Sequence, residues 1–231
     1  VVPAVAYGGV GMFLLRAGFV SFSMGGFFER GEASLSQPFF SWHPWLYLFL
    51  VPALGMRLWA DENRLGTIEL LLTLPLAPWH AIIGKFVAAW LVLGLSLLLT
   101  LPLVVTVNFL GVPDGGAIFC GYLGSFLLAG AYLALTCVTS AASRNQVVSF
   151  ILSVVACLFL VLCGYPPVTE AVKEIAPNAV WLVNAVASLS VMPHFDMFQR
   201  GLLSLGGVVY FASVIVVCLY LTSVILRSHR R

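Results

Sequence analysis

The sequence has very little charge. Of its 231 residues, 11 are Lys or Arg and 9 are Asp or Glu, so charged residues make up 9% of the chain and hydrophobic residues 61%. A soluble domain of this size needs a polar, charged surface that this composition cannot supply, which excludes soluble enzymes and soluble DNA-binding domains. The net charge of +2 is also too small and too dispersed for a nucleic-acid-binding surface, so we expect no nucleic-acid partner.

Motifs for nucleotide binding, metal binding and acid-base catalysis are also missing. A Walker A loop needs GxxxxGK followed by Ser or Thr, but the pair Gly84-Lys85 is followed by Phe86. The four histidines are scattered without HExxH spacing, and the five cysteines lie in apolar runs without a CxxC pair. We expect no catalytic residue, metal site or cofactor in this chain, and we expect the cysteines to be buried as small apolar residues.

Long apolar runs predict an all-α polytopic membrane protein with a single transmembrane domain over residues 1–231. A spanning helix needs about 20 apolar residues to cross the hydrocarbon core. The runs are continuous rather than alternating, which favours a helical bundle over a barrel. Because the sequence starts at Val1 rather than Met, we also expect that a native segment precedes it. Six runs are long enough, at about residues 2–24, 42–58, 81–110, 117–142, 147–165 and 202–226.

The basic residues predict the orientation of these spans. If segment 59–80 is cytoplasmic, seven basic residues flank the spans on that side, and three lie outside. The positive-inside rule favours this choice, with both termini in the cytoplasm. The inner set is Arg57, Arg64, Lys85, Arg144, Arg227, Arg230 and Arg231, and the outer set is Arg30, Lys173 and Arg200.

Arg16 lies inside the first predicted span. A charged residue at membrane depth is costly, so Arg16 is a candidate functional residue. The alternative is that it reaches the outer interface or pairs with Glu29 or Glu32 in the following loop. Both interpretations stay open at this stage.

The external segment 166–201 contains an apolar stretch at 179–189 that is too short to span a membrane. This predicts a re-entrant or interfacial helix before the last span. A solvated loop helix is the alternative.

The cytoplasmic segment 59–80 holds more charge and more local structure signals than a simple connection needs. Gly66 ends the preceding helix, Thr67 is suited to cap a new one, and Glu69 in the first turn matches the helix dipole. Pro75 stops that helix. The pattern predicts a short helix over 68–74 on the cytoplasmic surface.

At this segment the chain resembles the permease subunits of ABC-2-type ABC exporters. That family carries an acidic and basic stretch, a GTxExLLTxP element and a later GK between its second and third spans. Two further segments are similar to the gliding-motility-like branch: residues 3–7 with 13–15, and His194-Phe195-Asp196 followed by Arg200-Gly201. The matching residues of the central element are Gly66, Thr67, Glu69, Leu71, Leu72, Thr73, Pro75, Gly84 and Lys85.

The resemblance implies a multi-pass permease of the cell inner membrane, in contact with membrane lipid. ATP and Mg would be bound by a dimer of a separate ABC ATP-binding subunit, and a second permease copy or a paralogous permease would complete the complex. The segment from Glu62 to Pro75 would contain the helix that docks on the ATPase. The expected ATPase-coupling residues are Glu62, Arg64, Gly66, Thr67, Glu69, Leu71, Leu72, Pro75 and Lys85.

Two other functions stay open. The first is a gradient-driven secondary transporter or channel, although no cluster of acidic residues in the spans supports it. The second is a non-transporting membrane scaffold of a surface or motility machinery. Several polar residues in the spans either line a pathway or bond their own backbone: Ser96, Thr100, Asn108, Tyr122, Thr136, Thr139, Ser149 and Ser153.

Overall fold

The computed structural model describes residues 39–67, 78–110, 114–164 and 188–228, together with residues 11, 14 and 18. All regular secondary structure in these residues is helical, which confirms the predicted all-α class. The elements are η2 (Phe40–Trp42), α3 (His43–Gly55), α4 (Arg57–Leu65), α6 (Pro78–Leu98), α7 (Leu101–Leu110), α8 (Gly115–Ala142), α9 (Gln146–Leu162), α12 (Val191–Gln199) and α13 (Leu205–Ser228).

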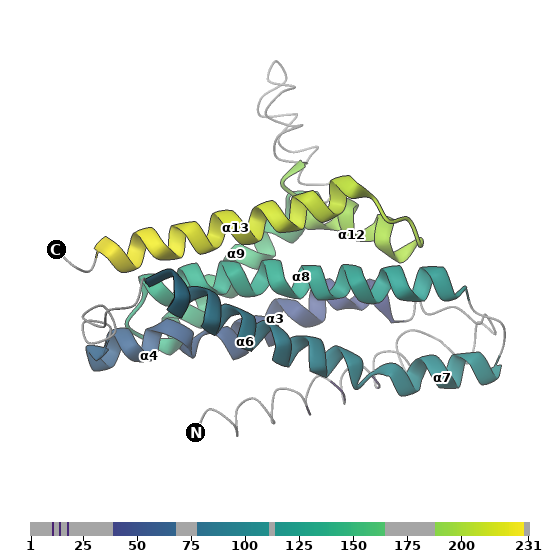
Figure 1. Ribbon diagram of the computed structural model, residues 1–231, viewed down its shortest axis with the longest axis horizontal. Coiled ribbons are helices and arrows are strands. Elements are labelled where there is room, and N and C mark those ends of the chain that lie inside the picture. The colour runs from purple at the N-terminus through teal and green to yellow at the C-terminus, as the bar shows by residue number, and fades with distance from the viewer. Residues whose placement is uncertain are drawn as a thin grey trace, which may run out of the picture.

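Helix α8 is the centre of the bundle. Figure 1 shows it between α13 on one side and α3 and α6 on the other. Within the protein, 61% of its most apolar stretch is buried, against 22% for the corresponding stretches of α6–α7 and α13. The other helices are therefore arranged around α8, which packs against α3, α4, α6, α9, α12 and α13.

Glycines on α8 create room for aromatic side chains from its neighbours. Gly121 lies against the ring of Phe40, Gly124 against Phe198 of α12, and Gly130 against the indole of Trp90. A Cβ atom added at Gly124 would lie 2.7 Å from Phe198 Cβ, which is closer than packed atoms allow. Small residues of this kind let membrane helices approach closely.

Helix α12 precedes the last long helix and was not predicted. The predicted helix at 179–189 falls almost wholly outside the described residues. The signal for α12 was Ser190, whose hydroxyl accepts from the Met192 N–H at 3.3 Å, three residues before Pro193. Phe195 and Phe198 on α12 are fully buried.

Of the two stretches that resemble the gliding-motility-like branch, the one at 194–201 lies in α12 and the turn after it, and the one at 3–7 with 13–15 lies outside the described residues except for position 14. The His194 ring stacks on Tyr210 of α13 at 4.1 Å, and its Nδ1 lies 3.1 Å from the Ser190 carbonyl oxygen. Burial raises the pKa of Asp196, and the nearby Arg200 partly opposes that shift. The stacking of His194 on Tyr210 holds α12 against the beginning of α13.

Three stretches in the described residues are long and apolar enough to cross a membrane: Trp79–Val105, Gly115–Ala142 and Leu205–Ser228. They coincide with three of the six predicted spans. Helix α9 is apolar but shorter, with 17 residues, and α3 has 13. The predicted span at 2–24 lies outside the described residues, except for positions 11, 14 and 18.

Two predicted spans differ in detail from the structure. The span at 42–58 is divided because α3 ends at Gly55 and α4 begins at Arg57. The span at 81–110 consists of α6 and α7 with a turn at Leu99 and Thr100. Pro102 explains this second break, because it has no N–H to donate to the carbonyl of Leu98 and its ring crowds that carbonyl. At this break the Thr100 hydroxyl donates to the Leu97 carbonyl at 2.6 Å.

The packing of α8 makes a prediction about Gly124. We expect Gly124→Ala to lower the free energy of unfolding by about 1–3 kcal/mol, because the new methyl group overlaps the Cβ atom of Phe198. Gly206→Ala on α13 is the matched control, since its Cβ would meet only Ser204 Oγ at 3.5 Å. Thermal unfolding in detergent measures both. Equal melting temperatures for the two variants would contradict the packing argument.

Candidate functional site

Helix α4 differs in character from α3, which it follows. Arg57, Asp61 and Arg64 face partly or fully outward, whereas Trp59 and Ala60 are buried at 1% and 0% exposure. The sequence changes from an apolar helix to an amphipathic charged helix at a single residue, Met56. The site is therefore built around the bend between α3 and α4, at the end of the bundle where α13 ends (Figure 1).

The bend comes close to α8 because of Gly55. A Cβ atom added there would lie 2.6 Å from Thr136 Cγ2 and 3.2 Å from Leu133 Cδ1, so a larger residue would push α3 away. The Met56 N–H continues the backbone bonding of α3 by donating to the Pro52 carbonyl at 2.8 Å. Gly55 thus brings the start of α4 within reach of side chains on α8.

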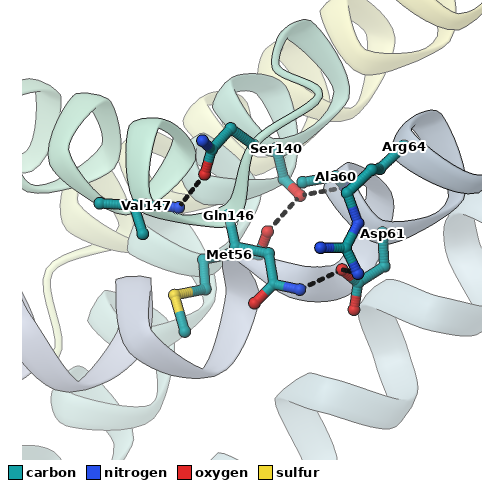
Figure 2. A network of polar contacts seen from close by, with 8 residues as sticks. Met56, Ala60, Asp61, Arg64, Ser140, Gln146 and Val147 are labelled. Atoms are coloured by element: carbon teal, nitrogen blue, oxygen red, sulfur yellow. Dashed lines mark hydrogen bonds and ion pairs between the residues drawn. The ribbon is translucent and has the colours of Figure 1, made fainter.

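Ser140 of α8 bonds the start of α4. Its Oγ accepts from the backbone N–H groups of Trp59 and Ala60, both at 3.0 Å, and donates to the Met56 carbonyl at 2.9 Å. The first N–H groups of a helix have no partner within that helix, and here a serine from another helix provides one. Figure 2 shows Ser140 between Met56 and Ala60. We call residues 140–146, which lead from α8 into α9, the α8–α9 corner.

Two more side chains join α4 to the α8–α9 corner. Asn63 donates through Nδ2 to the carbonyls of Ala141, at 2.8 Å, and Ser143, at 3.3 Å. These carbonyls belong to the end of α8, where helix carbonyls lack intrahelical partners. Gln146, the first residue of α9, donates to the Asp61 carboxylate (Figure 2). One helix is thus bonded to the end of α8 and to the start of α9.

Lys85 joins α4 to α6. Its Nζ donates to the Leu58 carbonyl at 2.9 Å, forms an ion pair with Glu62, and lies 4.0 Å from the centre of the Trp59 ring. The side chains of Lys85 and Glu62 are 26% and 27% exposed, so water still reaches the pair. Lys85 therefore does more than anchor a span at the membrane surface: it fixes the direction of α4.

Gly66 ends α4 as predicted. Its φ of 71° is left-handed, and its N–H donates to the Glu62 carbonyl. A Cβ atom there would meet nothing within 4 Å, so the backbone conformation and not the space requires glycine. Leu65, Gly66 and Thr67 are exposed at this end of α4.

The predicted site residues fall into two groups. Glu62, Arg64, Gly66, Thr67 and Lys85 lie on α4, at its end, or on the facing turn of α6. The other predicted residues lie outside the described residues, as does the predicted helix at 68–74. They are Arg16, Glu69, Leu71, Leu72 and Pro75.

Sequence reasoning missed Ser140, Asn63 and Gln146. A serine near the end of an apolar helix has many possible partners, and only the fold brings it to α4. The signal that was available is the polar run at 143–146, in which Asn145 caps α9 by accepting from the Val147 N–H at 2.9 Å.

The polar residues in the predicted spans mostly bond within the bundle. Ser96, Asn108, Thr136 and Ser153 each donate to the carbonyl four residues earlier. Thr100 contacts the Tyr122 hydroxyl at 2.9 Å, and Thr139 contacts Ser153 at 2.5 Å. Ser149 Oγ is the exception, because it is buried with no hydrogen-bond partner in the described part of the chain.

Metal-binding and cysteine chemistry have little support in the described residues. Within the described ranges, no group of three or more His, Cys, Asp and Glu side chains is arranged to hold a metal ion. All five cysteines are free and buried, as predicted.

The site is therefore a set of hydrogen bonds and ion pairs that join α4 to α6, α8 and α9. In a comparison with known families, the sequence model of the family described as ABC-2 family transporter protein matches residues 46–226. That range includes α4, α6 and the α8–α9 corner. A search of the curated proteins finds no match.

The contacts of Lys85 predict a stability difference. We expect Lys85→Met to lower the free energy of unfolding by about 1–2 kcal/mol, because it leaves the Glu62 carboxylate without its cation in a part-buried place. Glu62→Gln should cost less, since the amide oxygen still accepts from Lys85. Arg144→Met, at an exposed position of the α8–α9 corner, is the control. Thermal unfolding followed by tryptophan fluorescence is the measurement, and equal losses for Lys85→Met and Arg144→Met would contradict this assignment.

Proposed function

Since the chain belongs to the ABC-2 family of transporter proteins, we propose that it is the permease of an ATP-driven exporter and that α4 couples it to a separate ATP-binding subunit. Its long apolar helices and its family mark it as a transmembrane transport protein. Permeases of this family are membrane subunits that work with an ABC ATP-binding subunit. In this proposal ATP and Mg are bound there and not by this chain.

The distribution of charge supports a cytoplasmic position for α4. Five of the six described Lys and Arg residues lie at the end of the bundle that holds α4. Arg200 lies after α12, beyond the other end of α8. By the positive-inside rule the α4 end faces the cytoplasm, which puts both termini of a six-span chain in the cytoplasm of a cell inner membrane. The five residues are Arg57, Arg64, Lys85, Arg144 and Arg227.

The observation that carries this proposal is the attachment of α4 to three other helices. Ser140 bonds its start to α8, Gln146 bonds its middle to α9, and Lys85 bonds it to α6. Its last residue precedes Gly66 and the segment that contains the family element. A helix held at three points in this way moves with its neighbours, because any rotation breaks these bonds, and water cannot replace the buried bonds of Ser140.

The proposed mechanism follows from this attachment. The ATP-binding subunits close on ATP and displace the docked segment at 68–74, together with the exposed end of α4. The displacement reaches the spans through α4, and their rearrangement opens the pathway to the outside. The permease works as a pair, with either a second copy or a paralogue as its partner.

The experiment that tests the proposed function is a pull-down of this chain in nanodiscs from its native membrane, followed by mass spectrometry and an ATPase assay. We expect a nucleotide-binding subunit to copurify. Glu69→Arg and Gly66→Pro should weaken its association without preventing membrane insertion, since they change the docking segment and the end of α4.

Glu174→Arg is the matched control, because it makes the same charge reversal in the segment that we expect outside the membrane. It should leave the association unchanged. Recovery of the chain without an ATPase would favour a gradient-driven transporter. An ATPase that binds both docking variants as well as wild type would show that the coupling segment lies elsewhere, and an ATPase without transport would favour a scaffold of a surface machinery.

A further inference from the structure

We propose that the α8–α9 corner is the receiver of the movement of α4 and that Ser140 and Gln146 are its positioning residues. In this arrangement α4, the end of α8 and the start of α9 move as one body during the ATPase cycle. The inference rests on the proposed function and names the spans on which the coupling acts.

The Ser140 hydroxyl forms its hydrogen bonds with the start of α4 and not with the backbone of its own helix. Thr136, one helical turn earlier on α8, bonds locally by donating to the Tyr132 carbonyl at 2.8 Å. Such local bonding is the usual state of Ser and Thr in an apolar helix. Ser140 makes three bonds instead, all to the bend at the start of α4, and is fully buried.

The bonds to the α8–α9 corner extend along α4. Ser140 contacts its first turn, Gln146 contacts Asp61 in the middle, and Asn63 bonds the end of α8 two residues later. Contacts at several points along one helix resist rotation about its axis as well as translation. A shift of α4 must therefore displace the α8–α9 corner or break these bonds.

The connection to α6 is of another kind. Lys85 and Glu62 are each about a quarter exposed, so water can replace their ion pair when the helices separate. Ser140 has no access to water, and breaking its bonds would leave backbone groups of α4 unsatisfied. The movement of α4 therefore passes to α8 more firmly than to α6.

The movement continues into the bundle through α9. Thr139 of α8 and Ser153 of α9 have their hydroxyl oxygens 2.5 Å apart, and because the Ser153 hydroxyl donates to the Ser149 carbonyl, the Thr139 hydroxyl donates to Ser153. The start of α9 is thus joined to α8 on two levels, at Gln146 through α4 and at Ser153 directly. We therefore expect α9 to be the span that is displaced when α4 moves.

The test is hydrogen exchange followed by mass spectrometry on the complete complex in nanodiscs, without nucleotide and trapped with ATP and vanadate. In wild type we expect the trapped state to change exchange both in α4 and in the first turns of α9. In Gln146→Glu two carboxylates face each other, and we expect the response of α9 to be lost while that of α4 persists. The double variant Asp61→Asn with Gln146→Glu restores an amide and carboxylate pair with the roles exchanged, and it should recover the response of α9.

Ser140→Ala should also lose the response of α9. Its matched control is Ser125→Ala, because Ser125 is a fully buried serine on the same helix whose Oγ has no hydrogen-bond partner among the described residues. This control should respond as wild type does. If Ser140→Ala does not assemble, the Gln146→Glu variant and its double-variant rescue decide the outcome, since they remove no buried group.

Two outcomes separate the inference from the function on which it rests. An unchanged response of α9 in Gln146→Glu and Ser140→Ala, with α4 still responding, overturns the receiver role and leaves the proposed function in place. A wild-type complex in which α4 does not respond to trapping, or a chain that brings no ATPase with it, overturns both.

Discussion

The structure depends on the need to satisfy backbone polar groups where one helix ends and the next begins inside an apolar bundle. At Met56 the chain leaves α3 and starts α4, and the first N–H groups of α4 would be unpaired in a buried place. Ser140 accepts from the N–H groups of Trp59 and Ala60 and donates to the Met56 carbonyl with a single hydroxyl. Because that hydroxyl belongs to α8, the bend is fixed to the central helix, and the direction of α4 follows from it.

The packing of α8 supplies the frame for this bond. Its glycines receive Phe40, Phe198 and Trp90, which brings neighbouring elements close along its length. At the α4 end the relation is reversed, since Gly55 of α3 makes room for Thr136 of α8. On α8, the residue that meets Gly55 is Thr136, and it lies one helical turn before Ser140. The contact between Gly55 and Thr136 sets the distance between α3 and α8, and the hydrogen bonds of Ser140 set the orientation of α4.

Composition and local signals were enough to predict the membrane class, the all-α fold and the end of α4 at Gly66, because each depends on residues near in sequence. The breaks at Met56 and at Leu99 were harder to predict: an apolar run shows where helix is favourable, but not where it bends. Pro102 gave a usable signal for the second break. Ser140, Asn63 and Gln146 could not be predicted as a group, since their partners lie about 80 residues away in the sequence and only packing around α8 brings them together.

The structure also divides the charged residues of the site by what they can contact. Glu62 and Lys85 pair with each other, and Asp61 accepts from Gln146, so these groups act within the chain. Arg64 lies 3.9 Å from the Asp61 carboxylate but its side chain is 62% exposed, and Leu65 is 67% exposed beside Gly66 and Thr67. A partner that approaches α4 therefore meets its carboxyl end, at residues 64–67. The inner charges position the helix, and in the proposed function its exposed end is the part that docks on the ATP-binding subunit.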